Sequence, residues 1–196
     1  TTVSGATVFA PETQKRTSNK GRTETRTVGS KLTPTIKVNA TSIKLKVKQS
    51  TTKVKVSGLA NGDSVASWKS GNTKVVKVSG KPNGTCTLVA GRKKGKTTIT
   101  IILKSGLKKK ITITVQKAAV KTSKITGMPK NLKLKKNQTV TLKATAAPLT
   151  SLQKLKYKSS NKKIVTVTSK GVIKAKKKGK AVITVQSGSK TVKCKV

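Results

Sequence analysis

The chain has 196 residues, with 46 Lys and Arg, three Asp and Glu and no His, so its formal net charge is +43 at pH 7. This composition lacks the imidazoles of transition-metal sites, the clustered carboxylates of calcium sites and the usual residues of acid–base catalysis. We therefore expect no enzyme, no metal and no cofactor, and we expect no membrane span because no run approaches ~20 apolar residues.

Residues 1–34 are rich in Thr and Ser and contain two of the three acids. We interpret them as an extended N-terminal arm. Its first ten residues carry no charged side chain, and they include the apolar residues Val3, Val8 and Phe9. Val3 and Phe9 would share one face of a strand. We predict that residues 1–10 add a strand to a neighbouring copy, which would make the protein self-associate.

From residue 35 onward, apolar residues alternate with lysines, as in residues 43–48, 53–56, 132–135 and 191–196. A period of two places the apolar side chains on one face of a strand and the lysines on the other. Val, Ile and Thr favour strands, and no helical periodicity is present. The pattern predicts an all-β fold.

Two segments of the sequence occur twice. Residues 67–78 match residues 156–167, and residues 90–101 match residues 175–185. Each repeat is about 80 residues long, a length typical of tandem small domains rather than of solenoids. We predict one domain over residues 35–117 and a second over residues 118–196.

The second repeat contains Tyr157, then Ser159-Ser-Asn161, a Val-x-Val strand, and Lys-Gly-Lys-Ala181. These motifs resemble the bacterial Ig-like group 2 domain (BIG2), known from intimin and invasin-type adhesins and from phage surface proteins. The resemblance implies two tandem immunoglobulin-like antiparallel β-sandwiches without catalytic residues. It also implies an extracellular, cell-surface or virion location.

Trp68 and Tyr157 occupy matching positions in the two repeats. They could be stacking platforms for a sugar or base, but we favour core aromatics that close each sandwich. Cys86 and Cys194 fall on the apolar faces of their strands, where we expect two buried free thiols rather than a disulfide.

The lysines of the alternating runs should point outward, and their excess over acids favours a polyanion as partner. DNA, teichoic acid, lipopolysaccharide and a sulfated glycan are open alternatives, as is a merely solvated surface. With four Arg in the chain and no free aromatic residues, contact with a nucleic acid should be limited to its backbone. The candidate polyanion-contacting residues are Lys44, Lys46, Lys48, Lys53, Lys55, Lys133, Lys135, Lys154, Lys156, Lys176, Lys177 and Lys178.

Together these observations predict a non-catalytic structural or adhesive surface protein of a bacterium or phage. It would assemble through its N-terminal arm, as a filament, surface layer or virion component, and present a polycationic Ig-like surface. The alternative hypothesis is a polyanion-binding protein that acts alone.

Overall fold

The computed structural model describes residues 8–17 and 23–196, with side chains from residue 33 onward. Every regular element in these residues is a β-strand, which confirms the predicted all-β fold. Contacts divide the chain into two compact units, which hold Val47–Gln116 and Lys117–Val196 respectively. We call them the N-terminal domain (β3–β11) and the C-terminal domain (β12–β19).

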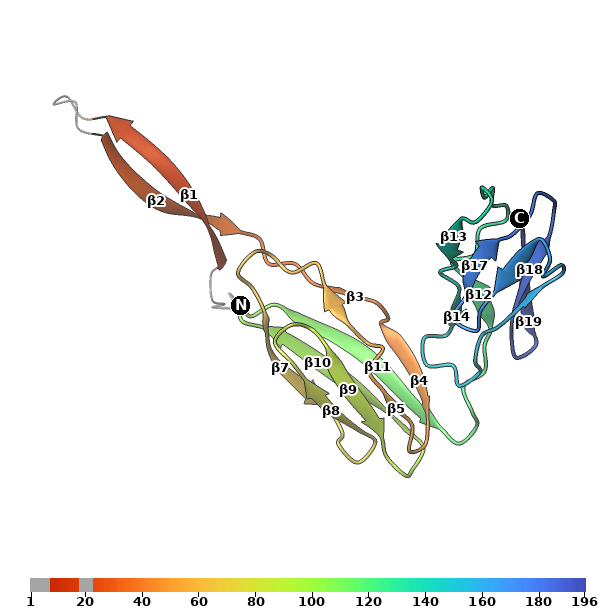
Figure 1. The fold of residues 1–196 in the computed structure, drawn as a ribbon. Helices are drawn as coiled ribbons and strands as arrows, with labels where there is room; N and C mark the ends of the chain where they lie inside the picture. The colour runs from red at the N-terminus through yellow and green to blue at the C-terminus, as the bar shows by residue number, and fades with distance from the viewer. Residues whose placement is uncertain (1–7, 18–22) are drawn as a thin grey trace. The chain divides into compact units, whose positions relative to one another are not determined.

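The first element is a β-hairpin within the segment predicted as an extended arm. Strands β1 (Val8–Thr17) and β2 (Thr23–Leu32) pair antiparallel (Figure 1). The backbone register runs from Val8 opposite Leu32 to Thr17 opposite Thr23. Both strands lie within residues 1–34, the segment predicted as an extended arm.

The N-terminal domain contains a four-stranded sheet in the order β4-β11-β10-β7, a three-stranded sheet β5-β9-β8 and the pair β3-β6. Ile99, Ile101, Ile111 and Leu88 are completely buried. Because the isoleucines come from one sheet and Leu88 from the other, the core lies between two layers. The strands are β3 (Lys37–Val38), β4 (Ser42–Lys46), β5 (Ser50–Thr51), β6 (Val56–Ser57), β7 (Val65–Ser70), β8 (Val76–Gly80), β9 (Cys86–Ala90), β10 (Gly95–Leu103) and β11 (Lys108–Gln116).

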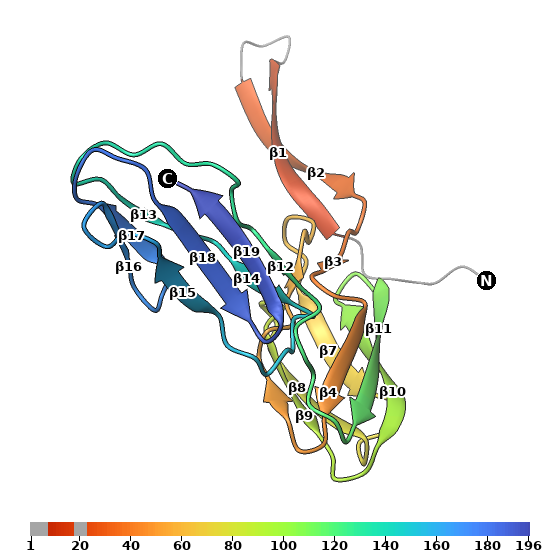
Figure 2. The same cartoon turned by 90° about the vertical axis from the view of Figure 1, so that its right-hand side faces the viewer.

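The C-terminal domain repeats this arrangement with the sheets β15-β18-β19 and β13-β17-β16 and the pair β12-β14 (Figure 2). Ile173 from one sheet and Ile183, Val185 and Cys194 from the other share one core cluster. The strands are β12 (Lys124–Thr126), β13 (Thr139–Thr141), β14 (Thr145–Ala147), β15 (Lys156–Ser159), β16 (Val165–Val167), β17 (Val172–Ala175), β18 (Val182–Ser187) and β19 (Lys190–Lys195).

Two of the alternating runs form the predicted strands, and two do not. Residues 43–48 and 191–196 are largely β4 and β19. In residues 53–56, alternate side chains are buried, but only one bridge and the start of β6 form. Residues 132–135 form no strand, and Leu134 is half-buried rather than core. Alternation determines which face of a segment is buried. The hydrogen bonds of a β-strand also require a neighbouring backbone segment as their partner.

No helix long and apolar enough to span a membrane occurs among the described residues.

Candidate polyanion-binding surface

The candidate lysines lie on the outer faces and loops of the two domains. Alternation produces this directly in β4, where Lys44 and Lys46 flank Leu45, which is 0% exposed. All the lysines predicted to contact a polyanion are exposed: Lys44, Lys46, Lys48, Lys53, Lys55, Lys133, Lys135, Lys154, Lys156, Lys176, Lys177 and Lys178.

Few carboxylates are available to neutralise these lysines. Asp63 is the only acid between residues 35 and 196. Its Oδ1 accepts hydrogen bonds from the backbone N–H groups of Ser64 (2.9 Å) and Ser105 (3.2 Å), and its Oδ2 accepts one from Ser105 Oγ (2.6 Å). Asp63 therefore ties one loop to another, and the side chains of the C-terminal domain contribute only positive charge.

Trp68 packs at the edge of the N-terminal core. It is half-buried against Val56, Val65 and Ile101, and its Nε1–H donates to the Lys81 carbonyl at 3.4 Å. The indole lies against Gly80, where a Cβ atom would overlap the ring. Because β7 is an edge strand of its sheet, part of the ring reaches solvent. The indole is therefore half-buried at the edge of the core that it was predicted to close.

Tyr157 has the corresponding place in the C-terminal domain. It is half-buried against that core, and a Cβ on Gly171 would lie 2.9 Å from Tyr157 Cζ. Burial raises the pKa of Tyr157 above its usual value. Its strand β15 is also an edge strand, so part of this ring reaches solvent too. Each ring contacts a glycine and packs against its core, which is the place predicted for a core aromatic.

The repeated Ser-x-Asn motif builds the same turn in both domains. Ser70 Oγ donates to the Val76 carbonyl at 2.7 Å, and Ser159 Oγ donates to the Val165 carbonyl at 2.6 Å. Two residues further on, Asn161 Oδ1 accepts from the Lys163 N–H at 2.9 Å, as Asn72 Oδ1 does from the Lys74 N–H at 3.0 Å. The motif is thus structural, and it gives the two domains matching connections between their sheets.

Comparison with protein families agrees with this architecture. Residues 119–196 match the family described as Bacterial Ig-like domain (group 2). The C-terminal domain belongs to this family. The N-terminal domain is a second β-rich domain with the same turn motif.

Individual proteins are similar to parts of the chain. A kappa-carrageenase of Pseudoalteromonas carrageenovora is 48% identical over 58 residues, which are 29% of this chain and 15% of the enzyme. Domains 5–6 of the S-layer protein SbsC are 24% identical, with a TM-score of 0.41, over 83% of this chain and 96% of that chain. A C-terminal intimin fragment, solved with the intimin-binding domain of its translocated receptor, is 18% identical, with a TM-score of 0.30, over 84% and 64% of the respective chains.

The two cysteines are free and buried, as the sequence predicts, with Cys194 in the group 2 domain and Cys86 in the N-terminal domain. Burial raises the pKa of the Cys86 thiol to about 11 and also raises the pKa of Cys194. A thiol that stays protonated at neutral pH is a poor nucleophile. The described residues contain no cluster of three or more His, Cys, Asp or Glu that could hold a metal.

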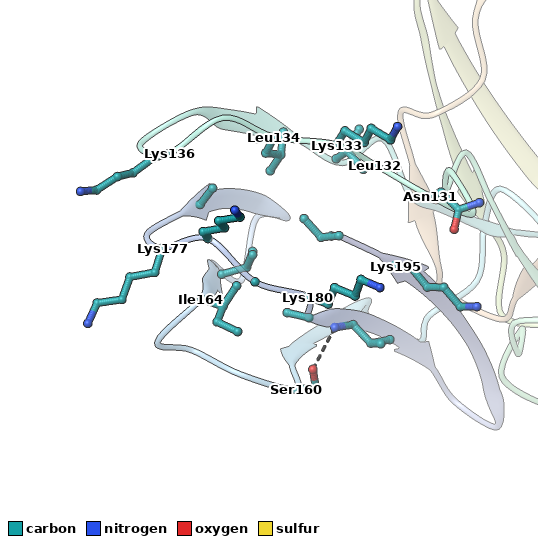
Figure 3. Close-up of a pocket in the computed structure, with 17 residues that line it drawn as sticks. Asn131, Leu132, Lys133, Leu134, Lys136, Ser160, Ile164, Lys177, Lys180 and Lys195 are labelled. Atoms are coloured by element: carbon teal, nitrogen blue, oxygen red, sulfur yellow. Dashed lines mark hydrogen bonds between the residues drawn. The ribbon is translucent and has the colours of Figure 1, made fainter.

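The group 2 domain also contains a groove of about 920 Å³ that sequence reasoning missed (Figure 3). Its apolar lining includes Leu132, Leu134, Ile164 and Val196. The side chains of several lysines surround this lining, and their alkyl stems contribute to its walls. The remaining lining residues are Asn131, Lys133, Lys136, Ser160, Val165, Ala175, Lys177, Lys178, Gly179, Lys180, Ala181, Val182 and Lys195.

The predicted assembly segment lies mostly beyond the described side chains. Val3 is outside the described residues. Val8 and Phe9 begin β1, where the backbone register pairs them with Leu32 and Lys31 of the same chain. The proposed contact of these residues with a neighbouring copy therefore stays a prediction.

Proposed function

We propose that this chain is a non-catalytic adhesive module, displayed on a bacterial surface or a virion, that contacts anionic polymers through its lysine-bearing faces. The observation that carries the proposal is the exposed lysine array with almost no carboxylate to balance it. Like charges at this density oppose folding, so a balanced surface would be more stable. A polyanion would offset that cost by placing negative charge beside the lysines.

The family supports an extracellular location, because group 2 domains occur in adhesins and phage surface proteins. Among the possible polymers, a sulfated glycan has separate support. The similar segment of the kappa-carrageenase belongs to an enzyme named for a sulfated galactan. Lysine suits such a ligand because its ammonium group is a compact charge that needs no planar partner.

Chromatography on immobilised heparin, a sulfated glycan, tests this function. We expect the protein to elute well above physiological ionic strength, about 0.15 M salt. We also expect a steep fall in affinity with increasing salt, because many ion contacts release counterions. Elution at or below physiological salt would contradict the proposal, and passage through uncharged dextran resin at the same salt is the control.

A second candidate function is self-assembly through the N-terminal segment. The observation in its favour is the two-stranded sheet β1-β2, in which each strand pairs on one side only among the described residues. A free strand edge can accept a strand from another chain. Assembly and polyanion contact are compatible, since the first ten residues are uncharged and the lysine faces belong to the two domains.

A further inference from the structure

Two lysines flank a threonine at matching places in the two domains. In the N-terminal domain, the register places Lys69 of β7 and Lys110 of β11 on either side of Thr100 in β10. In the C-terminal domain, Lys158 of β15 and Lys193 of β19 lie on either side of Thr184 in β18. We call each set of three a lysine rung.

Both rungs lie on the outer face of their sheet. Thr100 lies between Ile99 and Ile101 in β10, and both isoleucines are 0% exposed, so Thr100 points away from the core. Thr184 has the same place between the buried Ile183 and Val185. The four rung lysines are exposed. Among the described residues, neither threonine hydroxyl has a hydrogen-bond partner.

Abundant lysine alone does not account for the rungs, because the opposite sheets lack them. In the N-terminal domain, the corresponding line across β8, β9 and β5 reads Lys77, Val89, Ser50. Across β13, β17 and β16 of the C-terminal domain, it is Thr139, Lys174, Thr166. Each of these lines carries one lysine, so the paired arrangement is confined to one face of each domain.

The spacing within a rung suits a single anionic group. Neighbouring strands are about 4.8 Å apart, so the Cα atoms of the two lysines are roughly 10 Å apart. Their flexible four-carbon stems allow both ammonium groups to approach one anion above the threonine. The hydroxyl adds one hydrogen-bond donor. Two ammonium groups and one hydroxyl would then donate hydrogen bonds to the oxygens of a sulfate ester, and all three bonds are charge-assisted because the acceptor is an anion.

We propose that each lysine rung, taken within its own domain, binds one sulfate group of a sulfated polysaccharide. This inference rests on the proposed polyanion-binding function. A thin, flexible chain can follow a sheet surface and place successive sulfates over lysines. Duplex DNA is a stiff rod with a persistence length of about 150 base pairs, and a rod meets a sheet over a shorter line of contact. Arg, which suits bidentate phosphate recognition, is absent from both rungs.

The experiment compares two variants from which the same amount of charge has been removed. The rung variant carries Lys69→Gln, Lys110→Gln, Lys158→Gln and Lys193→Gln. The control carries Lys77→Gln, Lys81→Gln, Lys170→Gln and Lys174→Gln, which are exposed lysines on or beside the opposite sheets. A third protein, with Thr100→Val and Thr184→Val, removes the hydroxyls without changing charge. Calorimetric titration with a heparin oligosaccharide at fixed salt gives the dissociation constants, and circular dichroism checks folding.

We expect the rung variant to bind heparin at least about tenfold more weakly than the unmodified protein, the control variant to lose less than about threefold, and the threonine variant to fall between them. Completely desulfated heparin keeps only its carboxylates, so it should bind all of these proteins much more weakly than heparin does. Equal weakening in the rung and control variants would overturn the rung assignment while leaving polyanion binding intact. Failure of the unmodified protein to bind heparin would instead overturn the proposed function. Tighter binding of duplex DNA than of heparin, with the same loss in the rung variant, would overturn the choice of sulfated polysaccharide.

Discussion

Glycines that contact the aromatic rings hold these rings in place at the edges of the sandwiches. A substitution at Gly80 tests this contact directly. Gly80→Ala would place a methyl group inside the space of the Trp68 indole. We expect the ring to be displaced, at a cost of about 1–3 kcal/mol in the free energy of unfolding. Trp68 is the only Trp in the chain, so its fluorescence should shift to the red in the folded variant. Ser79→Ala, an exposed neighbour, is the control, and an unchanged spectrum in Gly80→Ala would contradict the ring-over-glycine contact.

Burial of the Cys86 thiol predicts a specific dependence of stability on pH. Its pKa is about 11 in the folded chain, against 9.0 for an ordinary thiol. The unfolded chain therefore loses this proton first as pH rises, so the stabilising contribution is complete below about pH 9 and disappears toward pH 11. Comparison with Cys86→Val isolates the contribution of the thiol, because the two proteins differ at this residue only.

We expect the free energy of unfolding of the unmodified protein to fall relative to that of Cys86→Val as the pH rises from 9 to 11. Chemical denaturation at each pH measures it. Identical pH profiles for the two proteins would show that the thiol is not shielded.

Among the elements, residues 43–48 and the similar residues 132–135 of the C-terminal domain differ in their backbone hydrogen bonds. β4 is hydrogen-bonded to β11, and just beyond it the Val47 N–H donates to the Gln116 carbonyl at 2.9 Å. In the corresponding run of the C-terminal domain, Leu134 N–H has no hydrogen-bond acceptor among the described residues. We predict that the Leu134 amide exchanges with solvent at least about tenfold faster than the Val47 amide. Hydrogen exchange followed by nuclear magnetic resonance measures both, and equal protection would contradict the structure.

These elements also show which structural features the sequence patterns can predict. Alternation and the repeat were enough to place Leu45, Val165 and Ile183 in the cores. They could not distinguish β4 from the strand-free run at residues 132–135, since pairing depends on backbone groups far away in sequence. The groove beside that run escaped prediction for the same reason.

The hairpin and the rungs were missed for different reasons. The polar composition of residues 1–34 suggested an arm, and the pairing of β1 with β2 depends on a backbone register that composition does not reveal. None of the rung lysines is among the candidates named from the sequence. Their position beside a threonine follows only from the register of three strands, one of which lies far from the other two in sequence.

For the whole molecule, the N-terminal segment is the part most open to deletion. Removal of residues 1–12 takes away the uncharged segment and half of β1, while the described cores lie entirely beyond residue 35. We predict that the truncated protein keeps its β-sheet circular dichroism and its heparin binding but no longer self-associates. Analytical ultracentrifugation of both proteins at equal concentration and salt tests this. Unchanged association after truncation would show that the segment is not the site of assembly.

The alternation of lysine with buried residues makes strands such as β4, β11 and β19 substrates for trypsin as soon as they leave their sheets, because cleavage follows lysine and requires an extended, accessible backbone. Lys117 and Lys121, by contrast, are exposed where one compact unit gives way to the next. Brief digestion should therefore cut between the units and at other exposed loop lysines, and the strands of each core should be degraded in a slower second step. The rate of that second step would report how often each sandwich opens.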